Sequence, residues 1–227
     1  MENIPSIAFE EMSGSAKGVT AAKTRGRKYI RNRGYGGNTR TEFQSSVKSV
    51  FKQLSQAWQG LTNAQILAWN SAAGSAEAKS ALGSKTKISG SNLFMRLNYW
   101  VVYCGGNILT TPPVLGGVDA PSEAVITLTA DKFTFELENA PVGADNLRLV
   151  IQASEPQSNG ITRAYAKAAA FADPYAVSGD EINLKADYEA KCGAPTAGLP
   201  KIFMKYFFVN VATGEKSGEM LAQVKLK

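Results

Sequence analysis

The sequence of 227 residues contains no histidine and only two cysteines, Cys104 and Cys192. Histidine is the commonest general base and metal ligand, so its absence excludes Ser-His and Cys-His dyads and the usual zinc centres. The two cysteines form no C-x-x-C spacing, which argues against a thiolate metal site and favours free thiols over a disulfide. We therefore expect a protein that is not an enzyme and that holds neither cofactor nor metal.

Long apolar runs are also missing, and no stretch approaches the ~20 residues that span a bilayer. The first residues, Met1 to Pro5, have neither the charged nor the apolar region of a secretory signal. The sequence has no Gly-rich phosphate loop between a strand and a helix and no acidic metal cluster. These features predict folding in a cytoplasm, without a membrane partner.

Acidic residues are absent from residues 12–40, which contain eight Lys and Arg and six glycines. Such a segment buries too little apolar surface to fold alone. We therefore predict an extended basic arm over residues 1–40. The partner-binding residues that we predict in this arm are Lys23, Arg25, Arg27, Lys28, Tyr29, Arg31, Arg33, Tyr35 and Arg40.

Three interpretations of the arm stay open. It docks on a neighbouring protein subunit and becomes ordered there, it binds nucleic acid through cations and stacking tyrosines, or it is a solvated tail. Along an extended chain, side chains at every second position share one face. The positions that this rule places together are Arg25, Arg27, Tyr29, Arg31 and Arg33.

Residues 41–108 show the pattern of a small helical bundle. Thr41 and Thr62 each begin a capping box, with Gln44 and Gln65 three residues on. Helices are predicted from Thr41 to a stop at Gly60, from Thr62 to a stop at Gly74, and from Ser91 to Gly105. Aromatic residues recur on their apolar faces, which is typical of a core. These are Phe43, Phe51, Trp58, Trp69, Phe94 and Trp100.

The second half of the chain changes to strand-like alternation. Residues 109–118, with Pro112 and Pro113, are predicted to be an extended linker. Strands are predicted at 125–129, 132–137, 146–153, 181–184, 201–211 and 220–226, and a helical turn at 187–192. This pattern indicates an antiparallel immunoglobulin-like or fibronectin-like β-sandwich over residues 119–227. The expected fold class is α+β, with an arm, a helical bundle and a sandwich.

Two motifs in the helical region resemble a family of structural proteins from tailed phages and prophages of Bacteroidetes, including crAss-like phages. The residues that carry the resemblance are Phe51, Trp58, Leu61, Thr62, Gln65, Trp69, Asn70, Ser89, Gly90, Asn92, Leu93, Phe94 and Asn98. The resemblance covers the first half of the chain well and the second half by architecture alone. It implies a role in the virion and no catalytic residues.

Together these observations predict a non-enzymatic structural component of a tailed-phage virion, assembled in the host cytoplasm. It would be an auxiliary capsid, head-vertex or tail-associated protein, present in many copies. Its expected partners are other virion proteins and copies of itself, held through the arm. The alternatives are a nucleic-acid-binding protein acting through the basic arm and a host- or sugar-binding module acting through the β-sandwich loops.

Overall fold

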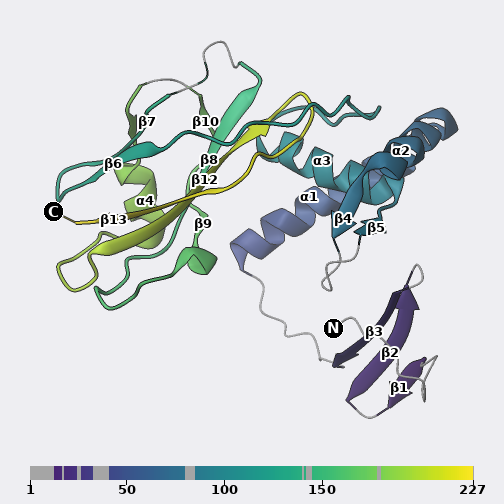
Figure 1. Cartoon of the computed structure of the whole chain (residues 1–227), viewed down its shortest axis with the longest axis horizontal. Helices are drawn as coiled ribbons and strands as arrows, with labels where there is room; N and C mark the ends of the chain where they lie inside the picture. The colour runs from purple at the N-terminus through teal and green to yellow at the C-terminus, as the bar shows by residue number, and fades with distance from the viewer. Residues whose placement is uncertain are drawn as a thin grey trace. The chain divides into compact units, whose positions relative to one another are not determined.

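The computed structural model describes residues 13–16, 18–24, 27–32, 41–79, 85–139, 141, 145–177 and 180–226 (Figure 1). These residues form helices and antiparallel sheets, so the expected α+β class is confirmed. The chain divides into two compact units, Met1–Lys52 with Thr62–Leu93 and Gln53–Leu61 with Phe94–Lys227. None of the described helices is long and apolar enough to cross a bilayer.

The described part of the predicted arm is a three-stranded antiparallel sheet. It consists of β1 (Gly14–Ala16), β2 (Val19–Thr24) and β3 (Arg27–Asn32), in the order β1-β2-β3. Ala16 pairs with Val19 and Thr24 pairs with Arg27, which is the spacing of two-residue hairpin loops. The segment therefore differs from the single extended arm that its composition suggests.

Helices α1 (Glu42–Gln59) and α2 (Asn63–Ser75) begin where the capping boxes predict. The Gln44 amide donates to the Thr41 hydroxyl at 3.2 Å. The Gln65 amide donates to the Thr62 hydroxyl at 3.4 Å, and the Thr62 amide donates to the Gln65 side chain at 2.9 Å. These reciprocal bonds satisfy amides that the first turn leaves without helical partners.

The predicted stop at Gly74 is wrong, because α2 continues to Ser75 and is capped by Ala76. A glycine ends a helix when it takes a left-handed conformation, and Gly74 is not among the described glycines with positive φ. A short hairpin of β4 (Glu77–Lys79) and β5 (Lys85–Lys87) follows α2.

Helix α3 (Gly90–Tyr103) begins at the second motif of the sequence. The Asn92 amide donates to the Ser89 hydroxyl at 3.3 Å, and the Gly90 amide donates to the Asn70 side chain at 3.2 Å. A Cβ on Gly90 would lie 2.8 Å from the Asn70 backbone nitrogen, so this close approach requires glycine. The helix ends before Gly105, whose φ is +77°.

The second unit contains two antiparallel sheets whose strands match the predicted ones closely. One sheet has the order β11-β7-β6, and the other has the order β10-β8-β12-β13 with β9 paired to β8. The strands are β6 (Ala124–Leu128), β7 (Phe133–Leu137), β8 (Leu147–Ala153), β9 (Ala169–Ala170), β10 (Tyr175–Ala176), β11 (Ile182–Asn183), β12 (Lys201–Asn210) and β13 (Met220–Lys225). A 3-10 helix, η1 (Tyr165–Lys167), and α4 (Lys185–Cys192) complete the unit.

The two sheets share one apolar core with α4. Phe135 of β7 and Tyr206 of β12 meet edge to face at 5.1 Å, and Tyr188 of α4 packs on Phe133 at 5.1 Å. All four are 0–2% exposed. Because aromatic side chains bury large apolar areas, these four side chains contribute strongly to the stability of the shared core.

Strand β12 is covered on both faces, as three successive aromatics require. Tyr206 and Phe208 belong to the shared core, while Phe207 points to the other side. There it meets Trp100 of α3 edge to face at 5.4 Å. From Phe94 onward, α3 therefore belongs to the same compact unit as the β strands, and the helical region 41–108 is divided between the two units.

The predicted linker is held near both ends by side chains of the second unit. The buried Asn98 accepts a bond from the Leu109 amide at 2.6 Å and donates to the Leu109 carbonyl at 3.4 Å. Farther on, the Gly116 and Gly117 amides donate to the Glu215 carboxylate at 3.3 and 3.1 Å. Residues 106–118 contain no helix or strand, yet they are anchored at both ends.

Candidate partner-binding site

The predicted partner-binding residues divide between the sheet of β1, β2 and β3 and parts of the chain outside the described residues. On the sheet are Lys23, Arg27, Lys28, Tyr29 and Arg31. Outside the described residues are Arg25, Arg33, Tyr35 and Arg40. The sequence therefore located a basic segment, and the structure folds five of its nine predicted residues into one sheet.

One face of this sheet carries Tyr29 and Arg31. Tyr29 pairs with Ala22, and Arg31 pairs with Thr20, so all four side chains point to the same side. The Thr20 hydroxyl lies 2.9 Å from the Ser15 hydroxyl, which continues this face onto β1. The predicted alternation is confirmed for Tyr29 and Arg31, the described members of the set whose side chains are placed.

The opposite face combines two lysines with small apolar side chains. Lys23 lies directly across from Lys28, and Ala21 lies across from Ile30. Val19 is on the same face and is 43% exposed. Like charges directly opposite each other on neighbouring strands destabilise a sheet. The register that folds this segment thus places two cations together beside an apolar strip.

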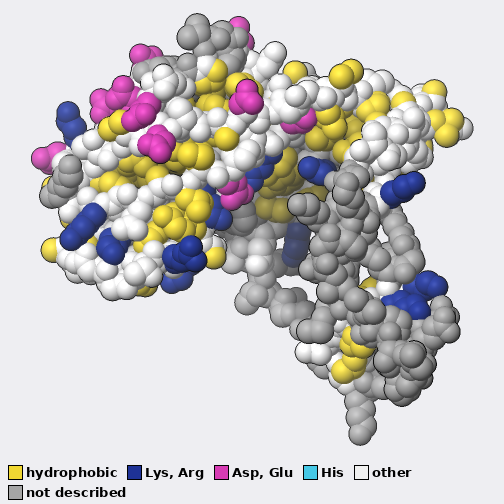
Figure 2. Space-filling view, in the orientation of Figure 1, with side chains coloured by type: hydrophobic (Ala, Val, Ile, Leu, Met, Phe, Trp, Pro, Cys, Tyr) yellow, Lys and Arg dark blue, Asp and Glu magenta, His cyan; other side chains and the backbone are white. Residues whose placement is uncertain are grey.

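The sheet buries little within its own chain. Of its side chains that the structure describes, all are exposed or half-buried. In the space-filling view, Lys and Arg side chains lie on the sheet beside hydrophobic ones (Figure 2). Three-stranded sheets gain stability from a covered hydrophobic face, so this sheet would be stabilised by a surface that covers one.

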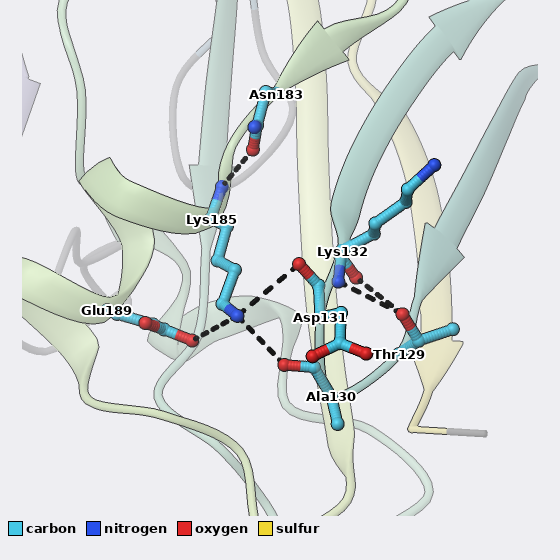
Figure 3. A network of polar contacts seen from close by, with 7 residues as sticks. All are labelled: Thr129, Ala130, Asp131, Lys132, Asn183, Lys185 and Glu189. Atoms are coloured by element: carbon cyan, nitrogen blue, oxygen red, sulfur yellow. Dashed lines mark hydrogen bonds and ion pairs between the residues drawn. The ribbon is translucent and has the colours of Figure 1, made fainter.

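A polar network in the second unit has a structural role instead. The Lys185 ammonium donates to the backbone carbonyls of Ala130 at 2.8 Å and Asp131 at 3.3 Å, and lies 3.9 Å from the Glu189 carboxylate (Figure 3). These contacts join the start of α4 to the turn between β6 and β7. Because three acceptors surround the ammonium, Lys185 is occupied in holding the fold.

A hollow of about 750 Å³ lies in the second unit at the end of β12. Its wall includes Phe208 and Leu147, and its polar groups are Asp119, Ser122, Asn139, Asp145, Asn146 and Asn210. Carboxylate, amide and hydroxyl groups of this kind bind neutral polar ligands such as sugars through hydrogen bonds. The hollow is the feature that agrees best with the alternative of a host- or sugar-binding module.

The cysteines and buried tyrosines hold their protons tightly. Burial raises the pKa of the Cys104 thiol to about 11, and burial with the nearby Tyr99 raises the pKa of Tyr103 to about 12. Burial also raises the pKa of Cys192. A raised pKa makes a thiol a poor nucleophile at neutral pH. In the described part of the chain, no group of three or more His, Cys, Asp or Glu side chains is placed to hold a metal ion.

The motif residues of the helical region have structural contacts. Thr62 and Gln65 cap α2, Asn70 meets Gly90, and Asn98 holds the linker. Sequence reasoning identified these positions without their partners, because only the fold brings Asn70 to Gly90. Comparison with known families, curated proteins and solved structures finds no match to this chain.

Proposed function

We propose that this chain is a non-enzymatic structural component of a tailed-phage virion, an auxiliary capsid, head-vertex or tail-associated protein that assembles in many copies through its N-terminal segment. One observation carries the proposal. The sheet of β1, β2 and β3 displays cations and apolar side chains while its described side chains are at most half-buried. A surface of this composition is suited to a neighbouring subunit that covers the apolar strip and supplies acidic groups.

The second unit supports a scaffold role in the same assembly. Its two antiparallel sheets meet in one core, which agrees with the proposed immunoglobulin-like or fibronectin-like sandwich. Helix α4 and the aromatic face of α3 are additions to that plan. The resemblance to virion proteins rests on residues that cap and lock helices, so it supports a shared fold more directly than a shared role.

The test is incorporation into particles. Virions from a host producing tagged full-length chain, or the chain without residues 1–40, are purified by density gradient and their proteins are quantified by mass spectrometry. We expect the full-length chain in the particles in many copies and the shortened chain among the unassembled proteins. Circular dichroism of the shortened chain should show that the second unit is still folded. Equal incorporation of both forms would contradict the proposal.

Nucleic-acid binding is a second candidate function, favoured by Tyr29 and Arg31 on one sheet face. The half-buried Tyr29 ring would stack on a base while neighbouring cations neutralise phosphates. Fluorescence anisotropy with single-stranded DNA at about 50 and about 500 mM salt tests it, because phosphate contacts weaken steeply with salt. Binding that survives replacement of Arg25, Arg27, Arg31 and Arg33 by alanine would exclude this role for the segment.

A further inference from the structure

The sheet β11-β7-β6 has an outward face that carries four glutamates. Phe133, Phe135 and Leu137 of β7 face the core, so the residues that alternate with them face away. On this outer face Glu136 lies across from Val125. Further along it are Glu123, Glu138 and Glu181, all exposed.

These glutamates lie side by side across neighbouring strands. The Glu138 amide donates to the Glu123 carbonyl at 3.1 Å, which places the two residues opposite each other. Ile182 pairs with Phe135, so Glu181 lies beside Glu136 in the next row. Both rows therefore hold two like charges across strands, an arrangement that costs stability. Within the described residues, none of the four carboxylates forms an ion pair.

An apolar residue on β6 continues the row of Glu181 and Glu136. Val125 is 51% exposed, and Thr127 and Thr134 continue the face toward the turn. Lys132 lies at that far end of β7, beyond Thr134, and does not separate the glutamates. The glutamate end of the sheet is thus an apolar residue flanked by negative charge.

The N-terminal sheet carries the complementary pattern. Lys23 and Lys28 face each other across β2 and β3, beside the exposed Val19 and half-buried Ile30. Neighbouring strands are spaced by about 4.8 Å in any β-sheet, so a lysine row on one sheet matches a glutamate row on another in spacing. Residues 12–40 hold eight basic and no acidic side chains, whereas residues 119–227 hold fourteen acidic and eleven basic ones.

We propose that the face bearing Lys23 and Lys28 in one copy of the chain docks on the face bearing Glu123 and Glu136 in a second copy. This inference rests on the proposed function and names the partner of the N-terminal sheet. Val19 and Ile30 cover Val125 in the contact, and the basic side chains of one copy face the carboxylates of the other. A second copy is the occupant that the charges favour, because every chain carries both surfaces.

Sedimentation velocity of the full-length chain tests the contact. At about 50 mM salt we expect a mass above the 24.2 kDa of one chain, and at about 500 mM salt a return to one chain, because ionic contacts are screened. The acid-face variant Glu123→Lys with Glu136→Lys and the basic-face variant Lys23→Glu with Lys28→Glu should each associate at least tenfold more weakly. The control Glu155→Lys with Asp173→Lys changes the net charge by the same amount as the acid-face variant, away from this face, and should associate like the wild type.

Charge reversal on both surfaces provides the decisive experiment. An equimolar mixture of the two variants should associate again, because the substituted positions of one variant carry charges opposite to those at the substituted positions of the other. A chain carrying all four substitutions should associate by itself. Circular dichroism and thermal unfolding check that each variant is folded. Failure of both the mixture and the fourfold variant to associate, with all chains folded, would overturn the docking proposal.

Other outcomes would also overturn it. A wild-type chain that is monomeric at low salt rules out the contact, as does association that survives both charge reversals. Association that nuclease treatment abolishes would mean that nucleic acid holds the copies together. If the chain enters particles but never self-associates, the docking proposal fails and the proposed function stands with another partner. Self-association without entry into particles would remove the virion role alone.

Discussion

Side chains alternate between the two faces in both three-stranded antiparallel sheets of this chain, β1-β2-β3 and β11-β7-β6. The two sheets differ in how deeply one of these faces is buried. In β7 the inward positions are Phe133, Phe135 and Leu137, each at most 4% exposed. In β2 and β3 the corresponding strip contains Val19, Ala21 and Ile30, with Val19 43% exposed. Alternation places side chains on faces, but their size and what covers them decide whether a face becomes a core.

The largest expected difference between the sheets concerns truncation of a central side chain. Phe135→Ala removes a fully buried ring that meets Tyr206, so we expect a loss of about 3–5 kcal/mol in the free energy of unfolding. Ile30→Ala, at a half-buried position, should cost about 1 kcal/mol or less. Urea denaturation followed by tryptophan fluorescence measures both. Equal losses would mean that the N-terminal sheet also has a covered core.

The second prediction concerns the buried side-chain amide of Asn98 and its effect on the stability of the second unit. Asn98→Ala removes both bonds to Leu109, leaving the part-buried Leu109 amide and carbonyl without these partners. A loss of about 1–3 kcal/mol is expected. Asn92→Ala, an exposed position on the same helix, is the matched control and should change stability little. Thermal unfolding reports the difference, and faster amide exchange at Leu109 would identify the cause.

Thiol reactivity compares the N-terminal sheet with the second unit, where Cys104 lies just after α3. With the pKa of Cys104 raised to about 11, little thiolate exists at pH 8. At about 500 mM salt, where the docking contact is screened, a Val19→Cys reporter on the N-terminal sheet should have an ordinary thiol pKa and react with iodoacetamide roughly ten- to a hundredfold faster. Because the raised pKa limits the thiolate, the Cys104 rate should still climb between pH 8 and 10. Peptide mass spectrometry resolves each cysteine, and equal rates at pH 8 would contradict the burial of Cys104.

The smallest expected effect concerns the like-charge rows. Lys28→Glu turns the pair with Lys23 into opposite charges and should protect the amides of β2 and β3 by a few tenths to about 1 kcal/mol in hydrogen exchange. The same substitution should weaken self-association in sedimentation. If amide protection increases while self-association is unchanged, the Lys23–Lys28 pair affects the stability of the sheet and has no role in docking.

Local sequence signals predicted much of the fold. The capping boxes at Thr41 and Thr62 specified where two helices begin, because their side chains bond to amides within three residues. Alternating apolar residues similarly identified β7, β8 and β12 to within a residue or two. These features depend on neighbours in sequence, so reading them requires no knowledge of the tertiary fold.

Other features depended on contacts that no local pattern contains. Composition alone does not predict the N-terminal sheet; the local signal for it is the eight-residue spacing of Gly18 and Gly26 between short segments. The bond from Gly90 to Asn70 and the hold of Asn98 on Leu109 arise only when distant segments meet. The glutamate rows likewise could not be predicted from the sequence, since Glu181 lies beside Glu136 only through the pairing of β11 with β7.

The edge-to-face contact of Trp100 with Phe207 has a consequence for synthesis of the protein. The helix leaves the ribosome roughly a hundred residues before the strand that covers its aromatic side, which at about 5–20 residues per second means a wait of about 5–20 s. During that interval Trp100 and Tyr103 are exposed on the nascent chain. Translation speed and chaperone supply, rather than the stability of the finished protein, would then set how much of it escapes aggregation.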